Sequence, residues 1–353
     1  MKKAIKIILI VLAVIVGLFA ALLIWLTVTQ LNVKTETAVV THGDNSTAAF
    51  APGDEVSILS WNIGYAGLGE ESDFFMDGGK QTRAPSKAIV EKNMDGIVET
   101  VQSMAADFTF LQEIDAGPST HAYGIEEAGR MRTETQLDSA HALNYKCAFV
   151  PYPIPPIGRV NTGLMTLSTA PIASAERIAL PSPFKWPVSV ANLKRCLMPV
   201  YIDLEGTDAQ LVLVNLHLEA YDDGEGKAAQ TAALTSFLEQ EYAKGNYVIA
   251  GGDFNQTFPG VLDKYPIKND QLWTPGTLDD SMLPDGWHFA YDTAVPTCRL
   301  DNQPYDAESE ATQHYVIDGF ILSPNVELTG VQTQNDGFRF SDHNPVLLNI
   351  RLK

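Results

Sequence analysis

The sequence predicts an α/β domain, with helices packed outside β-sheets, behind an N-terminal transmembrane helix. Three features of its 353 residues lead to this fold class: strand-like runs alternate with helical patterns, 45% of the residues are hydrophobic, and a long uncharged run stands near the N-terminus. So high a hydrophobic fraction is typical of a chain with a large core and excludes a disordered one. Three cysteines, at positions 147, 196 and 298, are too few for a disulfide-based scaffold.

The first expected element is a transmembrane helix over residues 7–28, within an anchor segment 1–31. This uncharged run has 22 residues, and about 20 are enough to cross a bilayer as a helix. It ends in bulky side chains from Leu22 to Leu26, where a cleaved signal peptide would carry small residues. We therefore expect an uncleaved anchor, with a cleaved signal peptide as the alternative. Lysines at positions 2, 3 and 6 predict a single-pass protein of the cell membrane with a cytoplasmic N-terminus and its domain outside the cytoplasm.

A linker and one large domain are expected to follow the anchor. Residues 32–54 are mostly polar or small and show no amphipathic period, which is typical of a flexible linker. Beyond them the sequence contains no internal repeat and no second linker. Residues 55–353 are therefore expected to form a single domain, of a size that layered α/β folds reach.

Strands and helices alternate through this domain. Two helical patterns stand out, one from near Ser86 to Met104 and one from near Gly226 to Tyr242. Nine runs have the composition of β-strands. They span residues 55–61, 108–112, 145–150, 163–167, 198–204, 211–216, 247–251, 316–322 and 346–352.

The charge of the chain bears on its partners. There are 43 acidic and 24 basic side chains, and the formal net charge is −19. Nucleic-acid binding usually needs a basic surface that attracts phosphates, so this charge disfavours DNA or RNA as the partner. A local basic pocket remains compatible with a nucleic-acid substrate.

Polar side chains stand at the ends of the first two strands, where α/β folds usually place their chemistry. Asn62 follows one apolar run and Glu113 follows the next. Asn62 is equally consistent with a turn, and a glutamate at a strand end is commonly solvated. Because Glu113 follows so apolar a run, it is a candidate ligand for Mg²⁺, which prefers oxygen donors.

Two later strands also end in polar residues. His217 closes an apolar strand, and histidine serves in structural hydrogen bonds as well as in proton transfer. Asp253 and Asn255 follow two glycines and point to the same side if the chain is extended there. The glycines permit either a tight turn or a close approach of the backbone to another group.

The last polar group includes Asp318, Asp342 and His343. Neighbouring side chains of an extended chain point to opposite faces, so Asp342 is poorly placed to orient His343. Asp318 is the candidate partner that fixes the tautomer of His343 and stabilises its protonated ring. Each of the three is also compatible with a solvated turn. No serine or cysteine nucleophile motif lies near them, so water is the expected nucleophile.

In this order the motifs resemble those of the endonuclease/exonuclease/phosphatase superfamily, with members such as deoxyribonucleases, abasic-site endonucleases, neutral sphingomyelinases and inositol polyphosphate 5-phosphatases. The resemblance covers about residues 56–353 and implies the family's four-layer α/β sandwich, two mostly antiparallel sheets flanked by helices. The motifs that carry it are Ser-Trp-Asn-Ile at 60–63, Leu-Gln-Glu at 111–113, Asn-Leu-His-Leu at 215–218, Gly-Gly-Asp-Phe-Asn at 251–255, Ile-Asp-Gly at 317–319 and Ser-Asp-His-Asn-Pro at 341–345.

The resemblance also implies a metal site and a base. By matching position, Asn62 and Glu113 resemble ligands of a catalytic Mg²⁺, for which Mn²⁺ is an alternative. Asp342 corresponds to a further ligand or a nearby carboxylate. Asp253 resembles the acid that orients or activates the attacking water, and Asn255 resembles the amide that holds a phosphate oxygen.

Two histidines complete the implied site. His343, paired with Asp318, resembles the histidine that contacts the scissile phosphate or takes a proton, and His217 resembles the one that assists the leaving oxygen. The family's Gly-x-x-x-x-Ser-Arg segment is matched only in part, at residues 163–169. Asn161 just before it is a candidate substrate contact or a loop cap, and Arg195 is a candidate substrate-binding arginine, with arginines 130 and 159 as alternatives.

The expected function is that of a membrane-anchored, Mg²⁺-dependent hydrolase of phosphoric esters, either a phosphodiesterase or a phosphatase. The anchor holds the site near a membrane and so favours a phospholipid head group as substrate. An extracellular endonuclease acting on DNA or RNA is the alternative, and an inactive binding module of the same fold is a further one.

Overall fold

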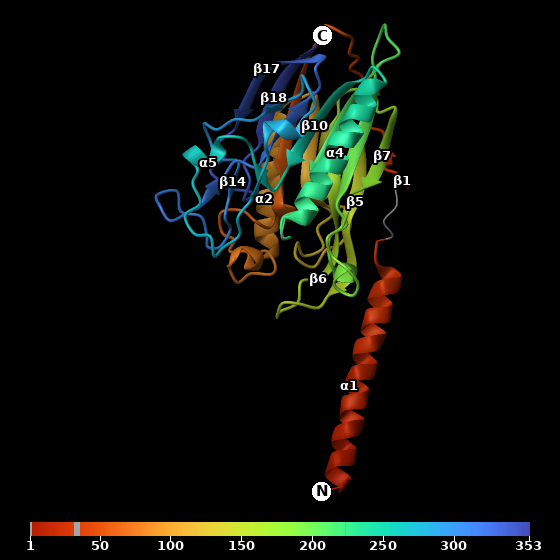
Figure 1. Cartoon of the computed structure of the whole chain (residues 1–353), viewed down its shortest axis with the longest axis vertical. Coiled ribbons are helices and arrows are strands. Elements are labelled where there is room, and N and C mark those ends of the chain that lie inside the picture. The colour runs from red at the N-terminus through yellow and green to blue at the C-terminus, as the bar shows by residue number, and fades with distance from the viewer. Residues whose placement is uncertain (1, 32–35, 223) are drawn as a thin grey trace.

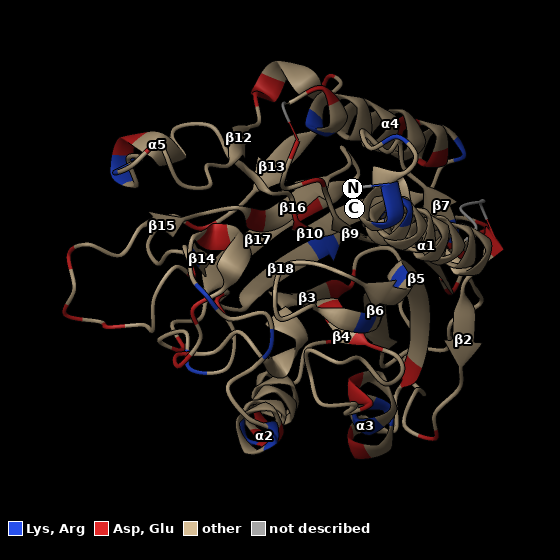
Figure 2. Cartoon of the chain, turned by 90° about the horizontal axis from the view of Figure 1, so that it is seen from below, with Lys and Arg blue, Asp and Glu red and all other residues tan. Residues whose placement is uncertain are grey.

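The computed structural model describes residues 2–31, 36–222 and 224–353. Helix α1 (Lys2–Thr29) projects from a domain built on two seven-stranded sheets (Figure 1). Helix α4 (Glu225–Ala243) covers one sheet, and α2 (Lys87–Met104) and α3 (Glu127–Thr135) cover the other (Figure 2). This four-layer α/β arrangement confirms the predicted fold class. Helix α3 was not expected from the sequence.

The first sheet contains one parallel pair, β3 and β4, and its other neighbours are antiparallel. This parallel pair lies in the middle of the sheet. The order of the strands in this sheet is β17 (Val326–Thr333), β18 (Val346–Leu352), β3 (Glu55–Asn62), β4 (Phe108–Asp115), β6 (Gly158–Ser168), β5 (Asp138–Val150) and β2 (Val39–Thr41).

The second sheet repeats this plan, with β9 and β10 as its parallel pair. Its order is β1 (Glu36–Thr37), β7 (Ser174–Ala179), β8 (Cys196–Asp203), β9 (Gln210–His217), β10 (Tyr247–Asp253), β16 (Asp318–Leu322) and β13 (His288–Ala290). The loops add β11 (Gln256–Thr257), β12 (Gly276–Thr277), β14 (Cys298–Arg299), β15 (His314–Tyr315), α5 (Val261–Lys264), η1 (Gly64–Ala66), η2 (Phe75–Asp77), η3 (Val188–Ala191) and η4 (Asp280–Met282).

Alternation along the strands explains the layers, because successive side chains of a strand face opposite sides. In β3, Ile58 enters the core between the sheets, whereas Leu59 packs beneath α2. Gln112 and Asn215 also face the space between the sheets, where Gln112 Nε2 donates to Asn215 Oδ1 at 2.8 Å. Helix α2 begins after Ser86, whose hydroxyl accepts from the amide of Ile89 and caps the helix.

Each of the nine predicted strand runs overlaps an observed strand, and both predicted helices are present as α2 and α4. The parallel pairs have a direct consequence for the site. Since parallel strands end at the same edge of a sheet, the last residues of β3 and β4 lie together, and so do those of β9 and β10.

The predicted linker is corrected by the structure. Strand β1 pairs with β7 and strand β2 pairs with β5, so each extends the edge of a different sheet. Ser46 and Phe50 are buried, and Asp138 accepts from the amide of Gly43 at 2.9 Å. The expectation of a flexible linker is therefore wrong for residues 36–50, because their backbone finds hydrogen-bond partners at the sheet edges. Residues 32–35 lie outside the described part of the chain.

Candidate active site

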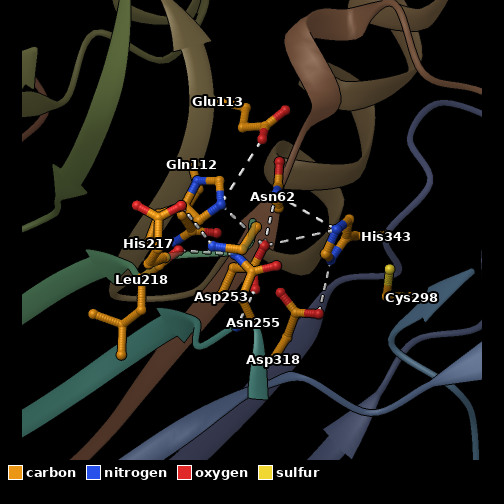
Figure 3. A network of polar contacts seen from close by, with 12 residues as sticks. Asn62, Gln112, Glu113, His217, Leu218, Asp253, Asn255, Cys298, Asp318 and His343 are labelled. Atoms are coloured by element: carbon orange, nitrogen blue, oxygen red, sulfur yellow. Dashed lines mark hydrogen bonds and ion pairs between the residues drawn. The ribbon is translucent and has the colours of Figure 1, made fainter. Parts of the chain in front are cut away.

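The ends of the two parallel pairs carry the predicted site residues. Asn62 ends β3, and Glu113 lies near the end of β4. His217 ends β9 opposite Asp253, which ends β10. Asp318 begins β16, where it pairs with Asp253 in register. These five residues come from five strands and meet at one edge of the two sheets (Figure 3).

Asp253 lies at the centre of the cluster. Its Oδ2 atom accepts a hydrogen bond from Asn62 Nδ2 at 3.0 Å. The same oxygen lies 3.3 Å from Nε2 of His217 and 3.8 Å from Nε2 of His343. Its other oxygen accepts from the amide of Asn255 at 2.8 Å. One carboxylate therefore stands between two imidazoles, as Figure 3 shows.

His343 is fixed by its neighbours. Its Nδ1 atom lies 2.8 Å from Asp318 Oδ2, which is the predicted pairing. Trp61 Nε1 donates to the carbonyl of His343 at 2.8 Å, and Ser341 Oγ accepts from its amide at 3.2 Å. Because Asp318 holds Nδ1, Nε2 is directed towards Asp253 and Asn62.

The two histidines have opposite electrostatic surroundings. Burial lowers the pKa of His343, but the charge of Asp318 and its hydrogen bond outweigh this, so the pKa lies well above its usual value. Burial lowers the pKa of His217 well below its usual value, and the charges of Arg195 and His343 lower it further. The site therefore holds a protonated histidine and a neutral one on either side of Asp253. Burial, together with the charge of Asp318, raises the pKa of Asp253 to about 6.

Oxygen donors suited to a divalent ion face the same cavity. Burial, with a smaller contribution from the charge of Asp253, raises the pKa of Glu113 to about 7. Burial also raises the pKa of Asp342 to about 7, with the charge of Glu113 adding to it. Two carboxylates that repel each other in a buried place favour a bound cation. Asn62 adds an amide oxygen, which accepts from the amide of Gly64 at 3.1 Å, so these residues fit a hard cation.

A second group has similar donor chemistry. Asp253, Asp318 and His343 offer ligand atoms that lie within 4.8 Å of one another. The Asp318 and His343 atoms are already joined by a hydrogen bond, so an ion at this place would displace it. Glu113 and Asp342 are therefore the more suitable pair.

Unusual backbone conformations occur at this edge. Glu113 and Asn255 have φ angles of 54° and 51°, a region that side chains other than glycine rarely adopt. Such strain is commonly found at functional sites, where the surrounding structure enforces it. Gly252 has a φ of 143°, and a Cβ there would lie 2.0 Å from the carbonyl oxygen of Leu216. A Cβ at Gly251 would instead lie 2.2 Å from the ring of Phe320 in β16. The two glycines before Asp253 thus allow a close approach to other groups, one of the alternatives that the sequence left open.

One cavity of about 390 Å³ is lined by all the predicted catalytic and metal-binding residues except Asp318, namely Asn62, Glu113, His217, Asp253, Asn255, Asp342 and His343. Arg195 also lines it and is only 4% exposed. Its Nε and Nη1 atoms find no hydrogen-bond partner among the described residues, and Glu219 is 4.0 Å away. Arg195 is thus a buried cation facing the cavity, as a substrate-binding arginine would be.

Not every sequence expectation falls in this cavity. Asn161 lines a separate cavity, and its side chain packs against Gly117. The expectation that Asn161 contacts substrate is therefore not supported, because β6 directs it away from the catalytic edge. Arg130 pairs with Asp95 on the surface.

Tyr65 is a residue of the cavity that was not expected from the sequence. It lines the cavity beside Glu113, whose pKa it lowers through a hydrogen bond, and its ring packs 4.4 Å from that of His121. Tyr65 has a φ of 55°, and it follows the Ser-Trp-Asn-Ile motif within three residues. That proximity was the only signal in the sequence.

Comparison with known proteins decides the family. Residues 59–343 match the endonuclease/exonuclease/phosphatase family. The chain belongs to this family. Its members are typically metal-dependent hydrolases of phosphoester bonds. No curated protein matches the sequence.

Solved structures share the fold at low identity. An endonuclease/exonuclease/phosphatase from Beutenbergia cavernae superposes with a TM-score of 0.58 at 18% identity, covering 84% of this chain and 72% of that one. The human nocturnin catalytic domain with bound sulfate gives 0.52 at 16%, covering 87% and 97%. TDP2 of D. rerio, complexed with a single-strand DNA product, gives 0.51 at 14%, covering 84% and 99%.

Proposed function

We propose that the protein is a membrane-anchored, divalent-metal-dependent hydrolase of phosphoric esters, a phosphodiesterase or phosphatase whose domain lies outside the cytoplasm. The observation that carries the proposal is the position of Asp253 between His217 and His343 in the cavity that Glu113 and Asp342 also line. Family membership supports the reaction class. Helix α1 supports the anchor, since it is long and apolar enough to cross a membrane.

The base in the proposed reaction is Asp253. Its raised pKa of about 6 brings it near the pH at which most enzymes work, where a carboxylate is best matched to proton transfer. Neutral His217, 3.3 Å away, helps to accept the proton of the attacking water. Asn62 and the amide of Asn255 hold the carboxylate in place through hydrogen bonds.

The acid in the proposed reaction is His343. Its protonated ring can donate to a phosphate oxygen or to the leaving oxygen, and Asp318 stabilises the positive charge. These protonation states support His343, rather than His217, as the donor to the leaving oxygen, which differs from the role that the resemblance implied for His217. Arg195 supplies a second positive group for the phosphate oxygens.

Glu113, Asn62 and Asp342 are the residues proposed to hold the metal ion. Such an ion supplies Lewis-acid stabilisation of the charge on the phosphoryl oxygens. Mg²⁺ is the proposed ion, with Mn²⁺ as a substitute, because the donors are all oxygen atoms.

Hydrolysis of bis(p-nitrophenyl) phosphate by the purified full-length protein tests the proposal. We expect turnover that requires Mg²⁺ or Mn²⁺, stops with EDTA, and falls about a hundredfold in His343→Ala, the scale of losing an acid–base group. His288→Ala, at a half-buried histidine outside the cavity, is the matched control. Absence of metal-stimulated turnover in the unaltered protein would favour a binding module of the same fold.

A further inference from the structure

The cavity has a polar and an apolar part. The polar part contains the candidate catalytic and metal-binding groups described above, and the proposed hydrolysis uses only these. The remaining wall is largely aromatic and aliphatic, which suits hydrocarbon and not the charged backbone of a nucleic acid. Its main side chains are Phe74, Phe75, Tyr152, Ile157, Val188 and Leu193.

Two loops at the mouth of this apolar part, residues 151–157 and 184–189, expose large apolar side chains. Tyr152 and Val188 line the cavity and are 60% and 58% exposed. Ile154 is 95% and Trp186 61% exposed. Outside α1, Val39 is the one other large hydrophobic side chain of the described ranges that is more than half exposed. Such a concentration of exposed apolar groups marks a site of contact with another apolar surface.

The same loops contact the end of α1. Leu26 is 2% exposed and packs in a cluster with Tyr145 and Val190. Trp186 Nε1 donates to Thr27 Oγ1 at 3.1 Å. Since Tyr145 also lines the cavity, the end of α1 lies beside the mouth. Figure 2 views the domain from the side of α1, with β5 next to this helix.

The length of α1 indicates which residues lie at the membrane boundary. Its uncharged run, residues 7–28, is about 33 Å long at about 1.5 Å per residue, close to the hydrocarbon thickness of about 30 Å. The turn with Leu26 therefore reaches the membrane boundary when the run spans the bilayer. Because this turn packs against the domain, the loops with Ile154 and Trp186 lie at that boundary as well. Trp and Tyr side chains favour this position in membranes.

We propose that the substrate is a phosphoester of a membrane lipid, which enters the cavity from the bilayer that α1 spans. The mouth lies on the membrane surface, the apolar wall receives the lipid's hydrocarbon portion, and the phosphoester reaches Asp253 and His343. This inference rests on the proposed hydrolase function. It adds the class of substrate and the direction from which the substrate arrives.

The test uses full-length protein reconstituted into phosphatidylcholine vesicles. The lipid probes are phosphatidic acid, phosphatidylglycerol, sphingomyelin and phosphatidylinositol 4,5-bisphosphate, each compared with its water-soluble counterpart lacking acyl chains. Bis(p-nitrophenyl) phosphate reports hydrolysis as such, and a single-stranded DNA oligonucleotide is the nucleic-acid probe. We expect at least one lipid to be hydrolysed about a hundredfold faster than its soluble counterpart at equal concentration, since burial of hydrocarbon adds to binding.

The outcomes separate the two proposals. If the chromogenic diester is hydrolysed but no lipid is favoured over its soluble counterpart, or DNA is the better substrate, the lipid proposal is wrong and the hydrolase function stands. If no probe at all is hydrolysed in the presence of Mg²⁺ or Mn²⁺, the hydrolase function fails.

A surface variant tests the direction of entry. Ile154→Asp places a charge on the mouth loop without touching the cavity lining, and its exposure makes misfolding improbable as a cause of any loss. We expect lipid hydrolysis to fall about tenfold or more, because a charge at the membrane boundary opposes contact, with the rate on bis(p-nitrophenyl) phosphate unchanged. Leu262→Asp, at an exposed leucine of α5, is the control. An equal loss in both variants, or no loss in Ile154→Asp, would contradict entry from the membrane.

Discussion

At the scale of single residues, the site depends on two histidines that share one carboxylate but differ in protonation. Asp318 makes the difference, because its hydrogen bond of 2.8 Å reaches His343 alone. His217 Nδ1 has no hydrogen-bond partner among the described residues. Both imidazoles lie near Asp253, but only His343 has a second carboxylate, that of Asp318, at its other ring nitrogen. This difference separates an acid from a base within a single cavity.

The variant Asp318→Asn tests this division. It keeps the size of the side chain but removes the charge that raises the pKa of His343. The protonated form is then lost at lower pH, so the alkaline limb of the pH–rate profile moves to lower pH. Turnover at pH 7 is expected to fall by about 10²- to 10⁴-fold. Kinetics over pH 5–9 check this, and an unchanged alkaline limb would mean that His343 does not act in its protonated form.

Arg195 gives the second residue-scale prediction. Arg195 lines the cavity, so Arg195→Gln removes the charged contact proposed for the substrate phosphate. The KM is expected to rise about 10- to 100-fold, the worth of a hydrogen bond to a charged group. Thermal stability should change little, because the ion pair with Glu219 is long, at 4.0 Å, and Glu219 keeps its hydrogen bonds from the amides of Ala220 and Tyr221. The exposed Arg159→Gln provides the control, and an equal rise of KM there would argue against a specific contact.

The residues of the site were largely predictable because they end apolar strands. A polar residue directly after such a run, as with Asn62 or His217, signals a sheet edge. Tyr65 could not be found this way, because it reaches the cavity through a loop whose left-handed backbone the sequence does not specify. Asn161 lines a different cavity because it lies within β6, where strand alternation and not sequence proximity decides the side that a residue faces.

At the scale of elements, the prediction was most accurate for buried strands and weakest at the edges. Strands such as β3 and β10 are mainly apolar and almost fully buried, because both of their faces are covered. Strands β1 and β2 carry few buried side chains and are held by backbone pairing. Backbone pairing of this kind depends little on which side chains a strand carries. The composition of residues 32–54 therefore did not reveal these strands, and a linker was predicted.

One carboxylate ties that segment to the domain. Asp138 is 2% exposed and accepts from the amides of Gly43 and Ile172, at 2.9 and 3.0 Å, and contacts His42 Nδ1 at 2.8 Å. Burial raises its pKa, but these hydrogen bonds prevail and lower it. A depressed carboxyl pKa contributes stability above the unfolded value of about 3.9, and that stability is lost as the pH falls through the folded value.

Asp138→Asn is therefore expected to destabilise the domain by about 1–3 kcal/mol at pH 7. The difference from the unaltered protein should shrink as the pH falls below the unfolded value of about 3.9 and through the lower folded pKa of Asp138, where the carboxyl becomes protonated in both states. Thermal unfolding from pH 7 down to the lowest pH at which the protein stays folded measures this. Asp44→Asn, at an exposed aspartate of the same segment, should leave the melting temperature unchanged. A pH-independent difference would show that charge is not the cause.

At the scale of the whole molecule, α1 and the cavity lie on the same side of the domain. The helix leaves the domain at the side where the catalytic strand ends lie, and Figure 1 shows it continuing away from the layers. An anchor at the opposite side would hold the cavity away from the membrane. The side of the membrane on which the domain lies, outside the cytoplasm or inside it, therefore decides which lipids and solutes the domain meets.

Cysteine labelling in intact cells determines that side. All three native cysteines are buried, so the unaltered protein should give little signal with a membrane-impermeant maleimide. Ser236→Cys adds an exposed thiol on α4, and the lysine flank predicts that it reacts without permeabilisation. The labelled protein should remain with the membrane fraction, because an uncleaved apolar helix of this length holds it there. Labelled protein in the medium would indicate a cleaved signal peptide, and labelling only after permeabilisation would place the domain in the cytoplasm.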